Sequence, residues 1–239
     1  MKIDAAIIGG TGVGERLATL GGRAFHVPTA AGMLRGRVVE HSGKTILLLR
    51  RHSAGHKVPP HLVNYASMAL GLRAVGVQAC FATAAVGSLR PEWGPGTLVV
   101  PHDFLDLTAR NLTLYDREVV HTDFSDPLPA RREILAAAES EELPVQDRGV
   151  YVCGNGPRYE SPHEIDLYGK VGDVVGMTAS SEAILMHEAG VRYGCLAVVT
   201  NLACGIADSP LSHEEVVEEM GRSGEKAVRI LLRAVANLG

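Results

Sequence analysis

The stretch "AIIGGTGVG" (residues 6–14) joins a short apolar run to a turn that contains four glycines. The apolar residues favour a buried strand. The glycines let backbone N–H groups approach a ligand closely, and such a turn directly after a strand often holds a phosphate. The stretch therefore predicts an anion site near the start of the chain, and the bound group could be a dinucleotide, a nucleoside triphosphate or a smaller phosphate.

The rest of the chain alternates apolar runs with segments of helical periodicity. Several runs are continuously apolar, which is typical of strands covered on both faces. This alternation predicts a single α/β domain over residues 1–239 with a largely parallel sheet. Strands are expected within residues 2–10, 36–51, 77–85, 96–107, 148–154, 172–177 and 194–203, and helices within 60–75, 129–142, 179–190 and 212–237. Ser212 and Glu215 form a capping-box pattern at the start of the last helix.

Composition narrows the class of protein. The 239 residues are 46% hydrophobic and 21% charged, with a formal net charge of −4. The negative charge and the lack of a Lys/Arg cluster argue against nucleic acid as a partner. No signal peptide or apolar run of membrane-spanning length is visible, so we expect a cytoplasmic protein without a membrane partner. Because its four cysteines form no CxxC pair, we expect buried thiols rather than disulfides or a metal site.

The glycine turn fits neither of the two common nucleotide motifs. Gly10 and Gly12 begin a dinucleotide fingerprint, but Glu15 stands at the third glycine position, and residues 15–35 show no clear helix–strand continuation. A Walker A loop would need a lysine before Ser or Thr. The backbone and Thr11 can still cradle a small anion, although a tight turn without a ligand remains open at this point.

A small anion also needs cationic partners. "LLLRRHSAGHKVPPH" (residues 47–61) places Arg51 and His52 directly after an apolar run. The planar guanidinium matches two phosphate oxygens, and a histidine can donate to a third. A solvated basic turn is the alternative interpretation.

Six motifs then line up in order over nearly the whole chain. They are IIGGTG (7–12), RRHSAGHKVPPHLVNY (50–65), AVGSL (85–89), PGTLVVPHDFLDLT (95–108), YVCGNGPRYESPHEI (151–165) and DVVGMTASSEAILMHEAG (173–190). Together they resemble the methylthioadenosine phosphorylase branch of the trimeric purine nucleoside phosphorylase family. The resemblance implies a single α/β domain with a mixed, distorted barrel-like sheet flanked by helices. It also implies a homotrimer, or a dimer of trimers, with active sites at subunit contacts.

The chemistry implied by the resemblance is phosphorolysis in purine salvage. Inorganic phosphate attacks the anomeric carbon of a purine nucleoside and gives the free base and a sugar 1-phosphate. Phosphate is a co-substrate, and no metal or organic cofactor is expected. Phosphate held below the sugar stabilises a ribosyl cation and captures it, so orientation supplies much of the rate. A preorganised hydrogen bond would stabilise the departing purine.

The resemblance also assigns residues to the site. The expected phosphate ligands are Thr11, Arg51, His52, Thr178 and the backbone N–H of Ala85. Ala84 departs from the family, which often has a hydroxyl residue there, so one contact is missing or is replaced by Thr83. Met177 is expected under the ribose, and Tyr159 against the base. His52 and Asn201 are the expected catalytic residues.

The base reader is expected in "VVTNLACG" (residues 198–205). Methylthioadenosine phosphorylases carry Asp-x-Asp there, whereas this chain has Asn201 and Ala203. An asparagine amide can donate to a 6-carbonyl and accept from a protonated N7, which fits hypoxanthine or guanine. Glu160 can accept from N1–H. These residues predict inosine or guanosine as substrate, with an adenine-type enzyme as a rival.

The 5′ pocket leaves two substrates open. His213, in "SHEEVVEEM" (212–220), stands where methylthio-specific members are apolar, and a histidine there bonds a 5′-hydroxyl. His121 matches a family histidine that reaches the 5′ pocket of the neighbouring subunit. 5′-Methylthioinosine therefore remains an alternative substrate. Outside this chemistry, a nucleoside-binding protein without catalysis and a dinucleotide-dependent oxidoreductase are the rival interpretations.

Overall fold

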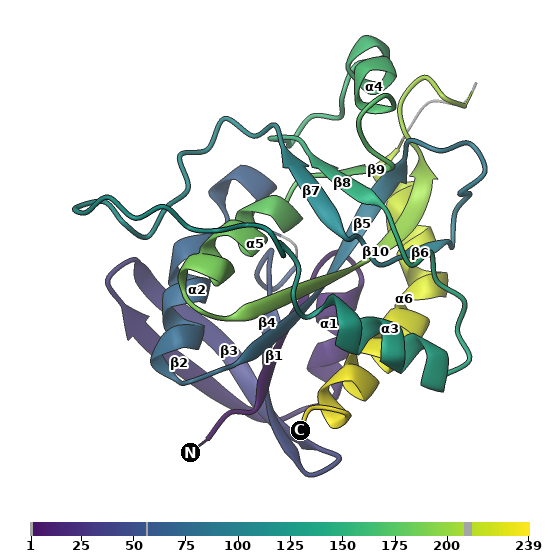
Figure 1. Cartoon of the computed structure of the whole chain (residues 1–239). Coiled ribbons are helices and arrows are strands. Elements are labelled where there is room, and N and C mark those ends of the chain that lie inside the picture. The colour runs from purple at the N-terminus through teal and green to yellow at the C-terminus, as the bar shows by residue number, and fades with distance from the viewer. Residues whose placement is uncertain (1, 56, 208–211) are drawn as a thin grey trace.

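A branched, ten-stranded mixed sheet forms the centre of the computed structural model, which describes residues 2–55, 57–207 and 212–239 (Figure 1). Adjacent strands of the sheet follow the order β2-β3-β4-β1-β5-β9-β8-β7, and β10 pairs with both β5 and β6. The strands are β1 Ala5–Gly9, β2 Arg23–Thr29, β3 Gly32–His41, β4 Lys44–Arg50, β5 Ala79–Ser88, β6 Leu98–Val99, β7 Asp103–Asp106, β8 Val150–Cys153, β9 Val174–Gly176 and β10 Arg192–Leu202.

Helices cover both faces of this sheet, as Figure 1 shows: α2 and α5 lie on one side, and α1, α3 and α6 on the other. The helices are α1 Val13–Thr19, α2 Tyr65–Ala74, α3 Arg131–Ser140, α4 Pro162–Tyr168, α5 Ala179–Glu188 and α6 His213–Ala236, with a 3₁₀ turn η1 at Pro60–Leu62. The double cover explains why the central strands are continuously apolar; in β1, Ala5, Ala6, Ile7 and Ile8 are all fully buried.

The central strands bring distant segments to one edge. β1 is parallel to β4 and β5, and β5 is parallel to β10. Parallel strands end on the same side of a sheet, and ligands bind in the crevice outside their carboxyl ends. Gly9 pairs with Arg50, so Thr11 and Arg51, which follow these strands, leave the sheet next to each other.

The structure corrects three expectations from the pattern. The sheet is mixed rather than largely parallel, as the family resemblance implies, because β2, β3 and β4 form an antiparallel meander. Residues 36–51 hold two strands, since Ser42 and Gly43 turn the chain with positive φ. Residues 15–35 contain most of α1 and all of β2; α1 has seven residues, too few for a clear helical period, and β2 is mostly solvent-exposed.

The cysteines are unpaired thiols. Cys80, Cys153 and Cys195 are buried, and Cys204 is half-buried. Burial raises the pKa of the Cys153 thiol to about 11 and that of Cys195 to about 12, so both stay protonated at neutral pH. In the described part of the chain, no helix combines the length and the apolar character that crossing a bilayer requires.

Candidate active site

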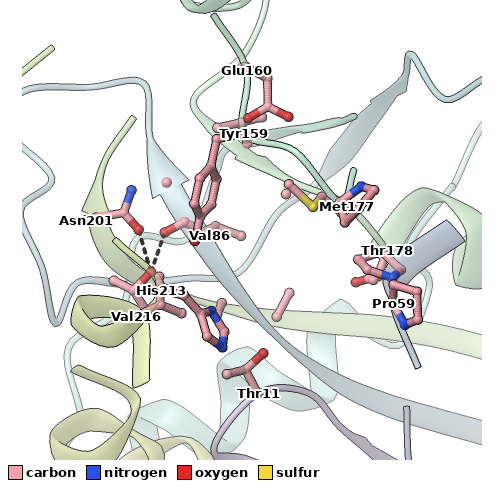
Figure 2. A pocket seen from close by; sticks show the side chains of 18 of the residues that line it. Thr11, Pro59, Val86, Tyr159, Glu160, Met177, Thr178, Asn201, His213 and Val216 are labelled. Atoms are coloured by element: carbon pink, nitrogen blue, oxygen red, sulfur yellow. Dashed lines mark hydrogen bonds between the residues drawn. The ribbon is translucent and has the colours of Figure 1, made fainter. Parts of the chain in front are cut away.

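A cavity of about 410 Å³ opens at the carboxyl ends of β1, β4, β5 and β10 (Figure 2). In Figure 2, Tyr159 and Glu160 lie at one end of the cavity and Thr11 at the other, with Met177 and Thr178 along one side. The predicted site residues in its lining are Thr11, Arg51, His52, Ala85, Tyr159, Glu160, Met177, Thr178, Asn201, Ala203 and His213. His121 does not line it, and lies exposed in the segment between β7 and α3.

The glycine turn after β1 supports the Thr11 end of the cavity. Gly10 N donates to Thr83 Oγ1 (3.1 Å), which ties the turn to β5. Thr83 is fully buried and is not among the residues that line the cavity. A glycine is needed at position 10 because Arg51 packs closely against it: a Cβ there would lie 2.5 Å from Arg51 Nη1.

Arg51 is held rigidly at the same end. Its Nε and Nη2 donate to Glu182 Oε1 and Oε2 (2.5 and 2.8 Å), and its Nη1 donates to Thr83 O (2.8 Å). Tyr193 Oη donates to Glu182 Oε2 (2.7 Å). Burial by itself lowers the pKa of Arg51, but the charge and hydrogen bonds of Glu182 outweigh it and raise that pKa, so the guanidinium stays charged.

His52 is fixed by the loop that follows it. Its Nδ1 donates to Val58 O (2.8 Å), and Val58 N donates back to His52 O (3.1 Å). A carbonyl only accepts, so Nδ1 carries a proton, and the ring orientation is set by the backbone. Thr178, at the start of α5, lines the same cavity and is nearly buried.

A β-bulge places Asn201 on the side of the cavity opposite Met177 (Figure 2). The register between β10 and β5 shifts so that Val199 faces Val86 and Asn201 faces Gly87. Thr200 is therefore the extra residue, and both Thr200 and Asn201 line the cavity although side chains in a regular strand alternate. Bulges beside active sites commonly re-aim a side chain in this way.

Hydrogen bonds define the orientation of the Asn201 amide. Nδ2 donates to Leu202 O (2.8 Å), and Oδ1 accepts from Thr200 Oγ1 (2.7 Å). Since a carbonyl oxygen cannot donate, only the nitrogen can face Leu202, and the assignment of the two amide atoms is unambiguous. Figure 2 draws the Thr200 bond together with its longer contact to Val86 O (3.3 Å).

The loop after β8 forms the opposite wall. Tyr159 is 39% exposed, while Glu160 is half-buried. Burial raises the pKa of the Glu160 carboxyl above its ordinary value. Gly156 has φ 59°, and a Cβ there would lie 2.4 Å from Met177 Sδ, so glycine lets Met177 pack beneath the loop.

The first turn of α6 closes the cavity. His213 begins this helix and lines the mouth, and its ring is turned in Figure 2 toward the side where Thr11 lies. Val216, one turn later, adds an apolar surface. Ser212 Oγ accepts from Glu215 N (3.2 Å), which is the hydroxyl half of the predicted capping box.

Sequence patterns missed three residues that shape this site. The patterns place Glu182 only in a helix and Lys57, which lines the cavity, only in a basic segment. Thr200 lies within the segment expected to read the base, but no pattern gives it a role of its own. A buried glutamate in an otherwise apolar helix face is the signal that could have drawn attention to Glu182. Among the residues that the structure describes, no cluster of three or more His, Cys, Asp or Glu side chains is placed to hold a metal ion.

Comparison with known proteins identifies the family. The sequence profile of the phosphorylase superfamily matches residues 4–236. The chain is 40% identical to a probable 6-oxopurine nucleoside phosphorylase of Moorella thermoacetica, over 98% of this chain and 92% of that protein. It is 39% identical to a probable S-methyl-5′-thioinosine phosphorylase of Methanothermobacter thermautotrophicus, over 97% and 83%.

Solved structures agree with the sequence comparison. The methylthioadenosine phosphorylase of Schistosoma mansoni in complex with adenine superposes with a TM-score of 0.92 at 28% identity, covering 98% of this chain and 91% of that one. The chain belongs to the phosphorylase superfamily. This confirms the family resemblance and the mixed α/β fold expected from the six motifs.

Proposed function

We propose that this protein catalyses the phosphorolysis of 6-oxopurine nucleosides, inosine and guanosine, in purine salvage. The observation that carries the proposal is the oriented amide of Asn201 at one end of a cavity whose other end holds Arg51 and Thr11. Relatives named as 6-oxopurine nucleoside phosphorylases, at about 40% identity over nearly the whole chain, support it.

Asn201 supplies the base selectivity. After its bonds to Leu202 O and Thr200 Oγ1, the amide keeps one N–H and one oxygen lone pair. The N–H donates a hydrogen bond to the 6-carbonyl, and the oxygen accepts a hydrogen bond from N7–H of the base, which is protonated at N7 as it leaves. Glu160, as a carboxylate, accepts from N1–H. A 6-amino purine would bring its N–H toward the asparagine N–H, two donors facing each other, which disfavours adenine.

Arg51 supplies the charge for the phosphate. Three of its five N–H donors are engaged by Glu182 and Thr83, and the other two are left for the co-substrate. A phosphate oxygen attacks C1′, the bond from C1′ to N9 breaks, and its electron pair goes to the purine. Thr11, His52, Thr178 and the Ala85 N–H complete the phosphate site in this scheme, which needs no metal or organic cofactor.

The assembly proposed is a homotrimer, or a dimer of trimers. His121 lies on a segment that runs outward from the body of the chain, and Val119 on the same segment is 86% exposed (Figure 1). An apolar side chain held in solvent on such an arm suits burial against a neighbouring copy. His121 would then reach the 5′ side of the neighbouring cavity.

5′-Methylthioinosine is the second candidate substrate. Val216 offers an apolar contact beside His213, and several relatives are named as probable S-methyl-5′-thioinosine phosphorylases. Asn201 would make the same hydrogen bonds to this nucleoside, because its base is also a 6-oxopurine. Only the 5′ group differs, and His213 as a donor favours a hydroxyl.

One assay separates these possibilities. Base release from inosine, guanosine, methylthioinosine and methylthioadenosine is measured with and without phosphate. We expect phosphate-dependent cleavage of the first two, with methylthioadenosine at least about tenfold poorer in kcat/KM. His213→Leu should shift preference toward methylthioinosine. A wild-type preference for methylthioadenosine would refute the role of Asn201, and release without phosphate would refute phosphorolysis.

A further inference from the structure

Arg110 lies outside the cavity lining, in the segment between β7 and α3, yet it bonds to both loops that hold the nucleoside end. Its Nη1 donates to Met177 O (3.1 Å) and to Ser181 Oγ (2.6 Å). Its Nη2 donates to Asn155 O (2.7 Å). One side chain thus joins the end of β9, the first turn of α5 and the loop after β8.

The joined segments carry the residues proposed to contact ribose and base. Met177 lies on one of them, and Asn155 begins the loop that leads to Tyr159 and Glu160. The two walls lie at the ends of adjacent parallel strands, since β8 pairs with β9. A planar guanidinium with donors in fixed directions sets the spacing between two carbonyls, which a flexible ammonium does not.

A third wall is packed against the same group. The Arg110 guanidinium lies 5.4 Å from the centre of the Tyr65 ring, in a cation–π arrangement. Tyr65 Oη donates to Pro60 O (2.9 Å), and Pro60 lines the cavity. Arg110 is therefore surrounded by three segments that line the site, while none of its bonds reaches Arg51 or Thr11.

We propose that Arg110 is a positioning residue that sets the distance between the Met177 and Asn155 loops and so aligns the nucleoside for attack. The inference rests on the proposed function of the cavity. Displacement of the sugar relative to the phosphate by about 1 Å can cost on the order of a hundredfold in rate. Arg51 and Thr11 are held by other contacts, and of the proposed phosphate ligands only Thr178 lies beside a residue that Arg110 bonds. The main effect of Arg110 therefore falls on the nucleoside.

The first test compares the effect of a substitution at Arg110 on the KM for inosine with its effect on the KM for phosphate. In Arg110→Met we expect kcat/KM for inosine to fall about a hundredfold, with the KM for inosine raised at least about tenfold and the KM for phosphate changed less than about threefold. Arg110→Lys should recover little, since one ammonium does not span both carbonyls. Guanidinium ion at millimolar concentration should partly restore the inosine KM of Arg110→Ala by filling the vacated position. Equal changes in both constants, or no change in either, would overturn the proposal.

Arg90→Met is the matched control. Arg90 is also a partly buried arginine that bridges segments, bonding to Asp173 (2.6 Å) and Gly169 O (3.4 Å), but away from the cavity. We expect it to lose stability with both Michaelis constants retained. A rise in the inosine KM of Arg90→Met equal to that of Arg110→Met would show that general loosening, rather than positioning, explains the effect.

Binding of free hypoxanthine, measured by calorimetry on the intact proteins, separates this inference from the proposed function. Its affinity should fall at least about tenfold in Arg110→Met and stay unchanged in Arg90→Met. Absence of phosphate-dependent cleavage by the wild type would refute the proposed function alone. Equal hypoxanthine affinity in the wild type and Arg110→Met, or no hypoxanthine binding by the wild type, would refute the positioning role.

Discussion

The guanidinium of Arg51 and the carboxylate of Glu182 form a buried, two-bond ion pair between residues 131 positions apart in the sequence. Their side chains are 1% and 0% exposed. The two parallel hydrogen bonds to Glu182 occupy one edge of the guanidinium, and Thr83 O accepts a hydrogen bond from Nη1. The direction in which Arg51 presents its remaining donors to the cavity is thus decided by a residue that does not itself line the cavity.

Glu182→Gln tests this relationship. It leaves a buried arginine without its counter-charge, so we expect the free energy of unfolding to fall by about 3–5 kcal/mol. The KM for phosphate should rise at least about tenfold, because Arg51 is no longer held in one orientation. Urea unfolding and phosphate titration at saturating inosine measure the two effects.

Tyr193→Phe is the control for Glu182→Gln. It removes one hydrogen bond to the Glu182 carboxylate and keeps the ion pair, so about 1–3 kcal/mol of stability should be lost. The phosphate KM should stay within about threefold of wild type. A Glu182→Gln protein with the wild-type phosphate KM would contradict the orienting role of Glu182.

Gly10→Ala should disturb Arg51 from the opposite side. The new Cβ would lie 2.5 Å from Arg51 Nη1 and 2.9 Å from Thr83 O, distances at which something must shift. We expect a loss of about 1–3 kcal/mol in unfolding free energy and a raised KM for phosphate. Urea unfolding and phosphate kinetics again provide the measurements.

Gly221→Ala is the matched glycine control. Gly221 lies in the interior of α6, and a Cβ there would have no heavy atom within 4 Å. Alanine should therefore stabilise the protein by about 0.4–1 kcal/mol without altering either KM. If Gly10→Ala behaved in the same way, close packing of Arg51 against the turn would not be needed.

Asn201→Asp should abolish the preference for 6-oxopurines. The carboxylate lacks the N–H that faces the 6-carbonyl and brings an acceptor toward an acceptor, so kcat/KM for inosine should fall on the order of a hundredfold or more. Initial rates with inosine and adenosine measure the change. Unchanged inosine cleavage would exclude Asn201 as the base reader.

Thr200→Val isolates the support of that amide. The hydroxyl that donates to Asn201 Oδ1 is lost while the side chain keeps its branched shape, so the amide is freer to rotate. We expect kcat/KM for inosine to fall about tenfold and phosphate KM to be retained. Equal activity in Thr200→Val and wild type would show that Leu202 O alone orients Asn201.

The half-buried carboxyl of Glu160 predicts a pH dependence. Burial raises its pKa above the ordinary 4.5, so the carboxylate that accepts from N1–H forms only at higher pH. The KM for inosine should therefore fall as pH rises through the raised pKa. The folded state binds this proton more tightly than the unfolded state, so stability should decline over the same rise in pH. Profiles of KM and of unfolding free energy against pH test both signs, and Glu160→Gln should flatten both.

Local patterns predicted the elements with a long, clear period. The segments 60–75, 129–142, 179–190 and 212–237 contain α2, α3, α5 and α6, because apolar residues at three- and four-residue spacing favour a helix buried on one side. Short or exposed elements carry little of this signal. For that reason the pattern predicts neither α1 nor β2, and it predicts one strand where the structure has the hairpin of β3 and β4.

The amino-acid sequence by itself determined the family, the apolar central strands and several of the residues around the cavity, since these follow from local composition and from motifs that keep their order. Tertiary structure alone decided how those residues are oriented. Arg51 is oriented by Glu182 and Asn201 by the bulge at Thr200, and the main-chain oxygen of Met177 is bonded by Arg110. Each of these contacts depends on which strands pair and which helix covers them, so the free energy that fixes the orientation comes from partners that no local pattern reveals.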